Sequence, residues 1–341
     1  MTAGLNALRL WYESRVQPDS KVSDRKIHLL VLLPFILALL LRGVGELFPP
    51  DEVWGHMGHS IGLSAWPWLF LLAPLWALIG RWRFGRWTRS MTVACLALPL
   101  AGIPYGPDSG EGRPIFVANV NAYTAGRVDL AQALADVGAD VVIEVEARAQ
   151  QIPGMDRVAH NFDEQVSRPS HYSAVYCRPG VRCEGAITEE FGARGMVMPL
   201  ALVRVEQEFC LMGTHGPPPV PFNIAGLIPY MERIAGTIDA GRMNSDWGPC
   251  LTGDPVIVAG DMNAVPGSWA TRPFNGRGLT DPTRFNGVFA TSWPSGGDWL
   301  NLPLMQLDHV WVGAINVGDV RNVRLPGSDH QGVFFRIKPG D

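Results

Sequence analysis

The last two thirds of the chain contain a series of polar motifs, each placed beside an apolar stretch of strand length. In chain order the motifs are Glu146, Thr214-His215, Gly260-Asp261-Met262-Asn263, Leu307-Asp308-His309 and Ser328-Asp329-His330. Together they supply carboxylates that can bind a hard cation and a base that can activate a water molecule. They also supply imidazoles that can stabilise the negative charge that develops on phosphate. The sequence therefore predicts metal-assisted cleavage of a phosphate ester, at a site built on loops that follow strands.

The apolar stretches around these motifs predict a fold with many strands and few helices. Strand-like runs cover residues 115–120, 140–145, 173–177, 198–206, 209–213, 256–259, 308–312 and 333–337, while helical spacing covers 128–137 and 228–240. This balance predicts two packed β-sheets with helices on the outside.

The N-terminal third carries three long apolar runs, at residues 27–41, 61–79 and 91–105. A membrane crossing takes roughly 20 residues, so the second run spans and the first spans with its flanks. The third run is short and contains Pro99 and Pro104, so a buried or interfacial helix is the alternative for it. A cleaved signal peptide does not fit, because 26 residues, two of them aspartates, precede the first run.

Positive charge predicts how these runs are oriented. Five Lys and Arg precede the first run and four lie between the second and third, whereas the loop between the first and second has only Arg42. By the positive-inside rule, three crossings place the C-terminal domain outside the cytoplasm. We therefore expect an integral protein of a bacterial inner membrane, with a cytoplasmic segment 1–26, about three transmembrane helices in 27–105, a linker 106–113 and an extracytoplasmic catalytic domain 114–341.

Charge and cysteine content narrow the function further. Residues 1–105 carry 10 Lys and Arg against 6 Asp and Glu, whereas residues 106–341 carry 18 against 26. An acidic catalytic domain argues against tight non-specific DNA binding. Its four cysteines, at positions 177, 183, 210 and 250, are open to two interpretations, disulfides outside the cytoplasm or free buried thiols.

The order and spacing of the motifs resemble the endonuclease/exonuclease/phosphatase superfamily, which has the DNase I-like fold, over about residues 114–337. The matching positions are Asn119, Glu146, Tyr172-Ser173-Ala174-Val175, Thr214-His215, Gly260-Asp261-Met262-Asn263-Ala264, Leu307-Asp308-His309 and Ser328-Asp329-His330. Ser292-Trp293-Pro294 and the helical anchor also resemble the membrane-anchored bacterial branch. Two departures are Val145, where the family often has Gln, and Cys177-Arg178 in place of Ser-Arg.

This resemblance implies a four-layer α/β sandwich, a divalent cation (Mg²⁺, with Mn²⁺ as the alternative) and in-line attack of water on a phosphate ester. It implies that Glu146, with Asn119 nearby, holds the metal and that Asp329 assists there. Asp261 would position or deprotonate water, while Asn263 and His215 stabilise the transition state. His330, oriented by Asp308, would stabilise charge or protonate the leaving group, and Tyr172 is a further site candidate.

Three functions follow as hypotheses. The first is a hydrolase acting beside the bilayer on a lipid-linked phosphate or pyrophosphate. The second is a membrane-tethered nuclease, with nucleic acid as its partner, for which Arg168, Arg178, Arg194, Arg272, Arg277 and Arg284 are the candidate contacts, although they form no visible cluster. The third is a membrane sensor that keeps the fold without catalysis. No protein partner is evident in the sequence.

Overall fold

The structure is a computed structural model. It describes residues 111–120, 129–146, 151–161, 172–188, 198–218, 224–282, 292–294 and 305–337, together with isolated helical residues between positions 36 and 63.

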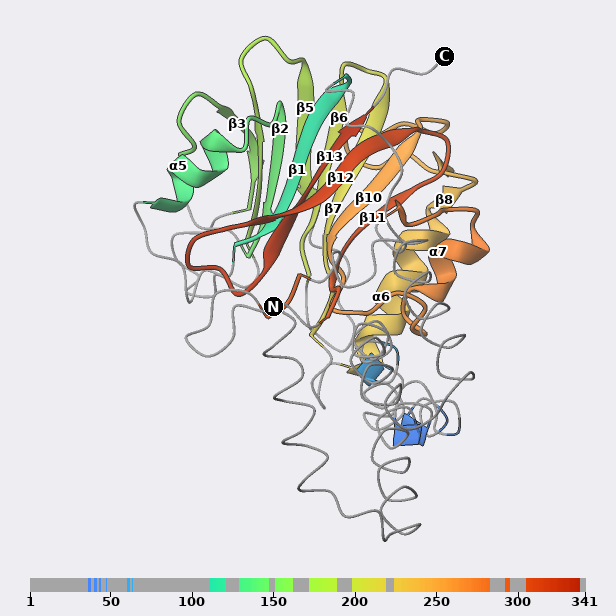
Figure 1. The fold of residues 1–341 in the computed structure, drawn as a ribbon. Coiled ribbons are helices and arrows are strands. Elements are labelled where there is room, and N and C mark those ends of the chain that lie inside the picture. The colour runs from blue at the N-terminus through green and yellow to red at the C-terminus, as the bar shows by residue number, and fades with distance from the viewer. Residues whose placement is uncertain are drawn as a thin grey trace, which may run out of the picture.

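Two mixed β-sheets form the centre of the molecule (Figure 1). The six-stranded sheet has the order β12-β13-β1-β2-β4-β3, and the five-stranded sheet has the order β11-β10-β7-β6-β5. In each sheet one parallel pair, β1 with β2 and β7 with β10, is surrounded by antiparallel pairs. The strands of the first sheet are β1 (Arg113–Asn119), β2 (Val141–Val145), β3 (Asp156–His160), β4 (Ser173–Cys177), β12 (Val317–Arg324) and β13 (Gln331–Ile337).

The second sheet contains β5 (Cys183–Thr188), β6 (Leu200–Val205), β7 (Phe209–His215), β10 (Val256–Asp261) and β11 (Asp308–Val312). A small ribbon of β8 (Ile238–Asp239) and β9 (Arg242–Met243) follows helix α6 (Ile224–Gly236), and the remaining helices of the described domain are α5 (Asp129–Asp136) and α7 (Arg272–Gly276).

Three apolar clusters hold these layers together. The cluster between the two sheets uses alternate residues of both, such as Val141 and Ile143 from β2 and Leu211 from β7. The intervening residue Val142 points to the opposite face, where it packs in the cluster that includes Leu134 of α5. Helices α6 and α7 cover the outer face of the five-stranded sheet. Because side chains alternate along each strand, every strand contributes apolar residues to both faces of its sheet. The predicted pair of packed sheets with outer helices is confirmed.

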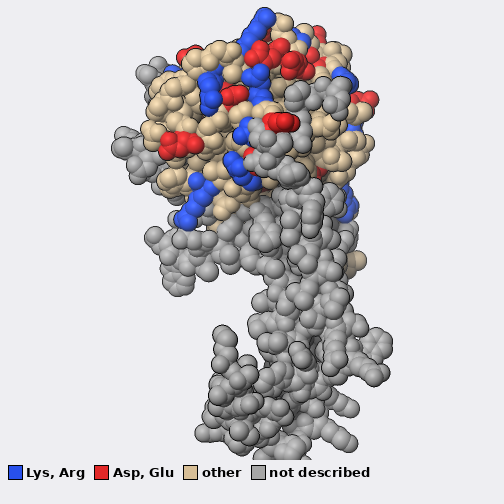
Figure 2. Space-filling view, turned by 45° about the horizontal axis from the view of Figure 1, so that its top comes forward, with Lys and Arg blue, Asp and Glu red and all other residues tan. Residues whose placement is uncertain are grey.

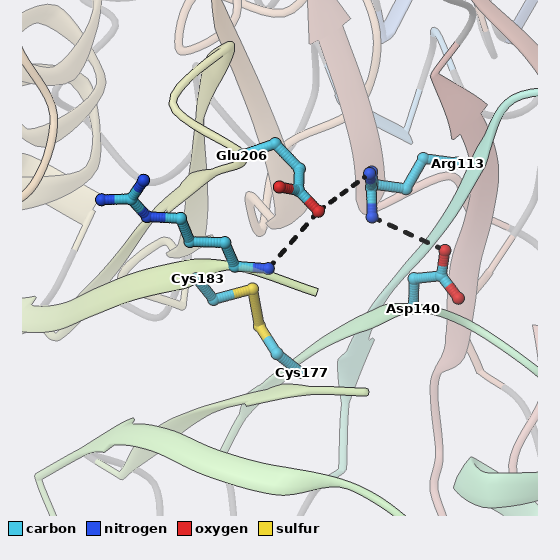
Figure 3. The surroundings of a disulfide bond; sticks show 6 residues. Arg113, Asp140, Cys177, Cys183 and Glu206 are labelled. Carbon is cyan, nitrogen blue, oxygen red and sulfur yellow. Dashed lines mark hydrogen bonds and ion pairs between the residues drawn. A yellow bond between two sulfur atoms is a disulfide. The ribbon is translucent and has the colours of Figure 1, made fainter. Parts of the chain in front are cut away.

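Two disulfides cross-link this domain, which decides between the two interpretations of its cysteines. Cys177 at the end of β4 is bonded to Cys183 at the start of β5, so the bond joins one sheet to the other. Arg113 lies nearby and pairs with Glu206 and Asp140 at 3.2 and 3.8 Å, as Figure 3 shows. The second bond, Cys210–Cys250, ties β7 to the loop that precedes β10.

The predicted membrane crossings fall largely outside the described residues. Among the residues that are described, no helix has the length and hydrophobicity needed to cross a bilayer.

Candidate active site

A cavity of about 360 Å³ lies where the ends of central strands from both sheets meet. β1, β2, β7 and β10 all run toward it, because each of these strands ends at or just before a residue that lines it. Eight of the nine catalytic and metal-ligating residues predicted from the sequence either line the cavity or contact a residue that does. The lining residues are Ser60, Asn119, Glu146, His215, Pro218, Asp261, Asn263, Val265, Trp293, Met305, Leu307, Asp329 and His330.

Asp261, the last residue of β10, is the centre of the polar network. Its side chain is buried, and its Oδ2 accepts a hydrogen bond of 2.8 Å from Asn119 Nδ2. Its Oδ1 accepts a 2.7 Å bond from the Asn263 backbone N–H. The Nε2 atoms of His330 and His215 lie 3.7 and 3.9 Å from Oδ2. Burial raises the pKa of Asp261, an effect that the His330 charge and these hydrogen bonds oppose.

His330 is held between two carboxylates. Its Nδ1 lies 2.9 Å from Asp308 Oδ2, while its Nε2 faces Asp261. Burial lowers the pKa of the imidazole, but Asp261 and Asp308 outweigh burial and the pKa is raised. His330 is therefore protonated at neutral pH and donates to Asp308, which fixes the direction of its ring. The predicted pairing of Asp308 with His330 is present in the structure.

Glu146 turns into the cavity directly after β2. It has a left-handed backbone, with φ of 50°, which is rare for a residue with a side chain and is typical of functional sites. Its Oε1 lies 3.4 Å from His215 Nε2. Burial raises the pKa of Glu146 to about 7, and the carboxylates of Asp261 and Asp329 add to this effect while His330 opposes it.

The loop after β10 depends on a glycine and a second left-handed residue. Gly260 has φ of 134°, and an added Cβ would lie 2.2 Å from the backbone oxygen of Thr214 on β7. Only glycine allows this close approach of the two strands. Asn263, with φ of 48°, donates from Nδ2 to the Gly216 carbonyl at 2.8 Å, so it joins the loops after β10 and β7.

Two residues of the site were noted in the sequence only as part of a family motif, Ser292 and Trp293. The buried Ser292 Oγ accepts hydrogen bonds of 3.1 Å from the backbone N–H groups of Leu307 and Asp308. Trp293 lines the cavity, and its Nε1 donates to Asp329 Oδ2 at 3.3 Å. Neither role has a local sequence signal, because both partners are distant in the chain.

The donor set fits a divalent cation. Glu146, Asp261 and Asp329 line one cavity, where burial and then the charges of Asp261 and Asp329 raise the pKa of Glu146. A bound cation would offset both effects. Asn119, Glu146 and Asp329, the predicted ligands, all line this cavity. Among the described residues, Asp261, Asp308 and His330 also bring one ligand atom each within 4.8 Å of one another. In that group, however, His330 is already hydrogen-bonded to Asp308.

Tyr172 is placed apart from the other predicted residues. It packs against the apolar cluster between the six-stranded sheet and α5, and it is not among the residues that line the cavity. Glu144 is also buried away from the cavity, next to Tyr176 on the same outer face, where the two side chains interact. A catalytic role for Tyr172 stays a prediction.

Comparison with known proteins identifies the family of this chain. The family model described as "Endonuclease/Exonuclease/phosphatase family" matches residues 116–330, which is more than half of the chain. The chain belongs to the Endonuclease/Exonuclease/phosphatase family. The match begins in β1 and ends at His330, directly before β13, so it contains every predicted site residue and all of the five-stranded sheet. No curated protein matches the sequence significantly.

Several solved structures are similar to this chain at low sequence identity. A humanized D. rerio TDP2 has a TM-score of 0.50 and 15% identity, with 67% of this chain and 99% of that chain covered. The human Nocturnin catalytic domain has a TM-score of 0.43 and 15% identity, over 67% and 94% of the two chains. An endonuclease/exonuclease/phosphatase from Beutenbergia cavernae has a TM-score of 0.43 and 16% identity, over 67% and 72%.

Proposed function

We propose that this protein is a membrane-anchored, divalent-metal-dependent phosphoesterase that hydrolyses a phosphate ester or pyrophosphate bond of a lipid-linked substrate. One observation carries the proposal. His330 links two carboxylates: its Nδ1 lies 2.9 Å from Asp308 Oδ2 and its Nε2 lies 3.7 Å from Asp261 Oδ2. His330, Asp261 and Glu146 line the same cavity. This arrangement combines a base that can activate water, an acid that can protonate the leaving oxygen, and a carboxylate that can bind a cation. Hydrolysis of a phosphate ester requires all three.

In this mechanism Asp261 positions the attacking water and accepts its proton. Its raised pKa makes it a stronger base than an exposed aspartate. His330, protonated and oriented by Asp308, has its Nε2 3.7 Å from Asp261 Oδ2 and donates a proton to the leaving oxygen or balances its charge. His215 and Asn263 lie close enough to Asp261 to stabilise charge on the phosphate oxygens.

Glu146, with Asp329 and Asn119, would hold the cation, either Mg²⁺ or Mn²⁺. When bound, the cation polarises the phosphate and offsets its negative charge. The residues of the chain also prepare this site: Trp293 orients Asp329, and the Asn119 amide holds Asp261 at a fixed position.

Exposed apolar residues support a substrate at the bilayer. Among the described residues, the large hydrophobic side chains that are exposed are Ile36, Leu37, Leu40, Leu47, Ile61 and Leu251, so all but one lie in the N-terminal third. We infer that the exposed side chains of the N-terminal third contact lipid or another partner, as contiguous exposed apolar surfaces do. The two disulfides support an extracytoplasmic location for the catalytic domain, because disulfides persist in oxidising compartments.

The nuclease alternative has less support. No Lys or Arg of the described part of the chain lines the cavity. Arg178 pairs with Asp140 at 3.3 Å, and the Arg272 guanidinium stacks 3.5 Å from the Trp269 ring centre, so both candidate contacts are engaged elsewhere. On the face shown in Figure 2, acidic side chains are interspersed among the basic ones. A nucleic-acid site normally presents a continuous basic surface.

The proposal is tested with the full-length protein in detergent and Mg²⁺, by measuring phosphate release from a polyprenyl pyrophosphate beside digestion of single-stranded DNA. We expect release from the lipid and a roughly 10²- to 10⁴-fold loss in His330→Ala, the range for removal of a general acid or base. His160→Ala is the matched control, because His160 is exposed on β3 and does not line the cavity.

The other outcomes separate the alternatives. DNA digestion without lipid hydrolysis would make the protein a tethered nuclease. Inactivity on both substrates, together with failure to bind Mn²⁺, would favour a non-catalytic sensor. Equal activity of His330→Ala and the wild type would contradict the catalytic role assigned to His330.

A further inference from the structure

Two side chains of β11 contact the loop that follows β10, at residues 261–264. His309 Nε2 lies 2.7 Å from the Ala264 carbonyl oxygen, and Trp311 Nε1 donates to the Met262 sulfur at 3.2 Å. A carbonyl oxygen only accepts hydrogen bonds, so His309 is the donor of the first contact. Both side chains of β11 are buried, and neither lines the active-site cavity. Any contribution that they make to the reaction is therefore indirect.

Neighbouring residues of β11 serve opposite faces of the five-stranded sheet. His309 and Trp311 share one face, where their rings stack with centroids 6.2 Å apart. Side chains alternate along a strand, so Asp308 points to the other face, where its Oδ2 lies 2.9 Å from His330 Nδ1. The dipeptide 308–309 thus reaches the proposed acid with one side chain and the loop that carries the proposed base with the next.

His309 is itself held in one orientation. Its Nδ1 lies 2.7 Å from Asp281 Oδ2, and Gln306 Nε2 donates to the same oxygen at 3.3 Å. Asp281 is buried and follows Thr280, which exchanges backbone hydrogen bonds of 2.8 and 2.9 Å with Val312 of β11. Because both ring nitrogens of His309 are bonded to groups fixed on the fold, the imidazole cannot turn without breaking one of these bonds.

The conformation of the loop decides how the Asp261 carboxylate is held. The Asn263 backbone N–H donates to Asp261 Oδ1 at 2.7 Å, in a left-handed backbone with φ of 48°. This conformation costs free energy for a residue with a side chain and persists only where its surroundings maintain it. Asn263 Nδ2 donates to the Gly216 carbonyl, and His309 holds the carbonyl of the next residue, Ala264. Release of Ala264 would let Asn263 relax and withdraw its N–H from Asp261.

We propose that His309 is a positioning residue, whose Nε2–H holds the Ala264 carbonyl and thereby keeps the Asp261 carboxylate oriented toward the attacking water. The effect passes through Asn263, whose N–H binds that carboxylate. This inference rests on the proposed phosphoesterase function, in which Asp261 is the base. His309 itself gives and takes no proton during the reaction.

The test compares His309→Gln with His309→Asn, as full-length proteins in detergent with Mg²⁺ and farnesyl pyrophosphate. Both variants lose the imidazolium, but each keeps a different donor. The glutamine amide nitrogen is as many bonds from Cβ as Nε2 is, so it still reaches Ala264, whereas the asparagine amide nitrogen replaces Nδ1 and reaches only Asp281. We expect His309→Asn to lower kcat by about tenfold to hundredfold with KM within about threefold, and His309→Gln to stay within about threefold of the wild type in both.

Val205→Ala is the matched control for stability. Val205 is buried and pairs with Phe209 at the start of β7, whereas the cavity lies at the end of β7, at His215. Its truncation leaves a cavity in the core and lowers the melting temperature without touching the loop. We expect Val205→Ala to keep the wild-type kcat at a temperature where circular dichroism shows every variant to be folded.

A second measurement does not depend on turnover. Hydrogen–deuterium exchange, followed by mass spectrometry, reports on the peptide that covers residues 260–266, in which the Met262 and Asn263 backbone N–H groups are hydrogen-bonded. We expect this peptide to exchange about tenfold faster in His309→Asn than in the wild type, as loss of one hydrogen bond implies. In His309→Gln its exchange should stay close to that of the wild type.

The outcomes separate the role of His309 from the proposed function. If the wild type hydrolyses the lipid, His330→Ala does not, and His309→Asn equals the wild type in kcat and in exchange, the phosphoesterase stands and the role of His309 is refuted. Equal losses of kcat in His309→Asn and His309→Gln would refute the contact with Ala264, and an equal loss in Val205→Ala would reduce the effect to stability. If the wild type is inactive, the proposed function fails on this substrate and exchange decides. Faster exchange in His309→Asn alone would support the hold of His309 on the loop, and equal exchange in all three proteins would overturn it.

Discussion

His309 and His330 each directly follow an aspartate, but their surroundings give the two histidines different functions. His330 faces the cavity, whereas His309 is fully buried behind it. His309 Nδ1 lies 2.7 Å from Asp281 Oδ2, and its Nε2 lies 2.7 Å from the Ala264 carbonyl oxygen. Two acceptors require two N–H donors, so His309 is an imidazolium that ties β11 to the loop after β10.

This buried ion pair predicts a pH-dependent contribution to stability. Burial lowers the pKa of His309, but Asp281 and the Ala264 carbonyl outweigh it and raise the pKa above 6.5. The contribution is therefore fully present below pH 6.5 and is lost as pH rises through the folded-state pKa. We expect Asp281→Asn to cost roughly 3 kcal/mol at pH 6 and less at pH 10, measured by urea unfolding. A cost that stays constant over this range would show that His309 is neutral.

Ser292 gives a second prediction at the scale of one side chain. Its hydroxyl accepts from two buried N–H groups, including that of Asp308. Ser292→Ala leaves both groups without this partner, at about 1–3 kcal/mol each, and displaces the carboxylate that orients His330. We expect kcat to fall more than tenfold with little change in KM, and Ser292→Thr to retain activity. A variant that loses only thermal stability would restrict Ser292 to a structural role.

At the scale of elements, the disulfides differ in the chain length that they close. Cys177–Cys183 spans 6 residues and Cys210–Cys250 spans 40. In the chain-entropy account, the longer loop contributes about 4 kcal/mol and the shorter about 2 kcal/mol. We expect replacement of both cysteines by serine to destabilise more for the 210–250 pair than for the 177–183 pair, measured by thermal unfolding in detergent. The opposite order would indicate that joining the two sheets matters more than loop length.

The sequence predicted the buried strands well, including the buried edge strand β11, and missed three partly exposed edge strands, for a physical reason. β1, β2, β4, β7 and β10 are almost fully buried and read as continuous apolar runs. β3, β5 and β12 lie at sheet edges and carry partly exposed residues, so their hydrophobic pattern is weak and none was predicted. Strand ends position the site, so motifs on buried strands located most of it. Ser60 and Ser292 depend on contacts distant in sequence, which no local pattern encodes.

At the scale of the whole molecule, the disulfides and the charge pattern both bear on the side of the membrane on which the catalytic domain lies. Arg81, Arg83, Arg86 and Arg89 precede the third apolar run, which decides on which side of the membrane the catalytic domain lies. Three crossings would place the domain in an oxidising compartment, where disulfides such as these two can form. Two crossings would leave the domain and its four bonded cysteines in a reducing cytoplasm.

We therefore expect a C-terminal alkaline phosphatase fusion to be active in a bacterial host, because this reporter is active only outside the cytoplasm. We expect a C-terminal green fluorescent protein fusion to be dark, because this reporter fluoresces only inside the cytoplasm. Deletion of residues 91–105 should reverse both signals and leave the cysteines reactive toward a thiol-specific polyethylene glycol. In the wild type, the same reagent should modify cysteines 177, 183, 210 and 250 only after reduction. Fluorescence of the wild-type fusion would place the catalytic domain in the cytoplasm. A lipid-linked substrate, as proposed, would then have to be presented at the inner leaflet.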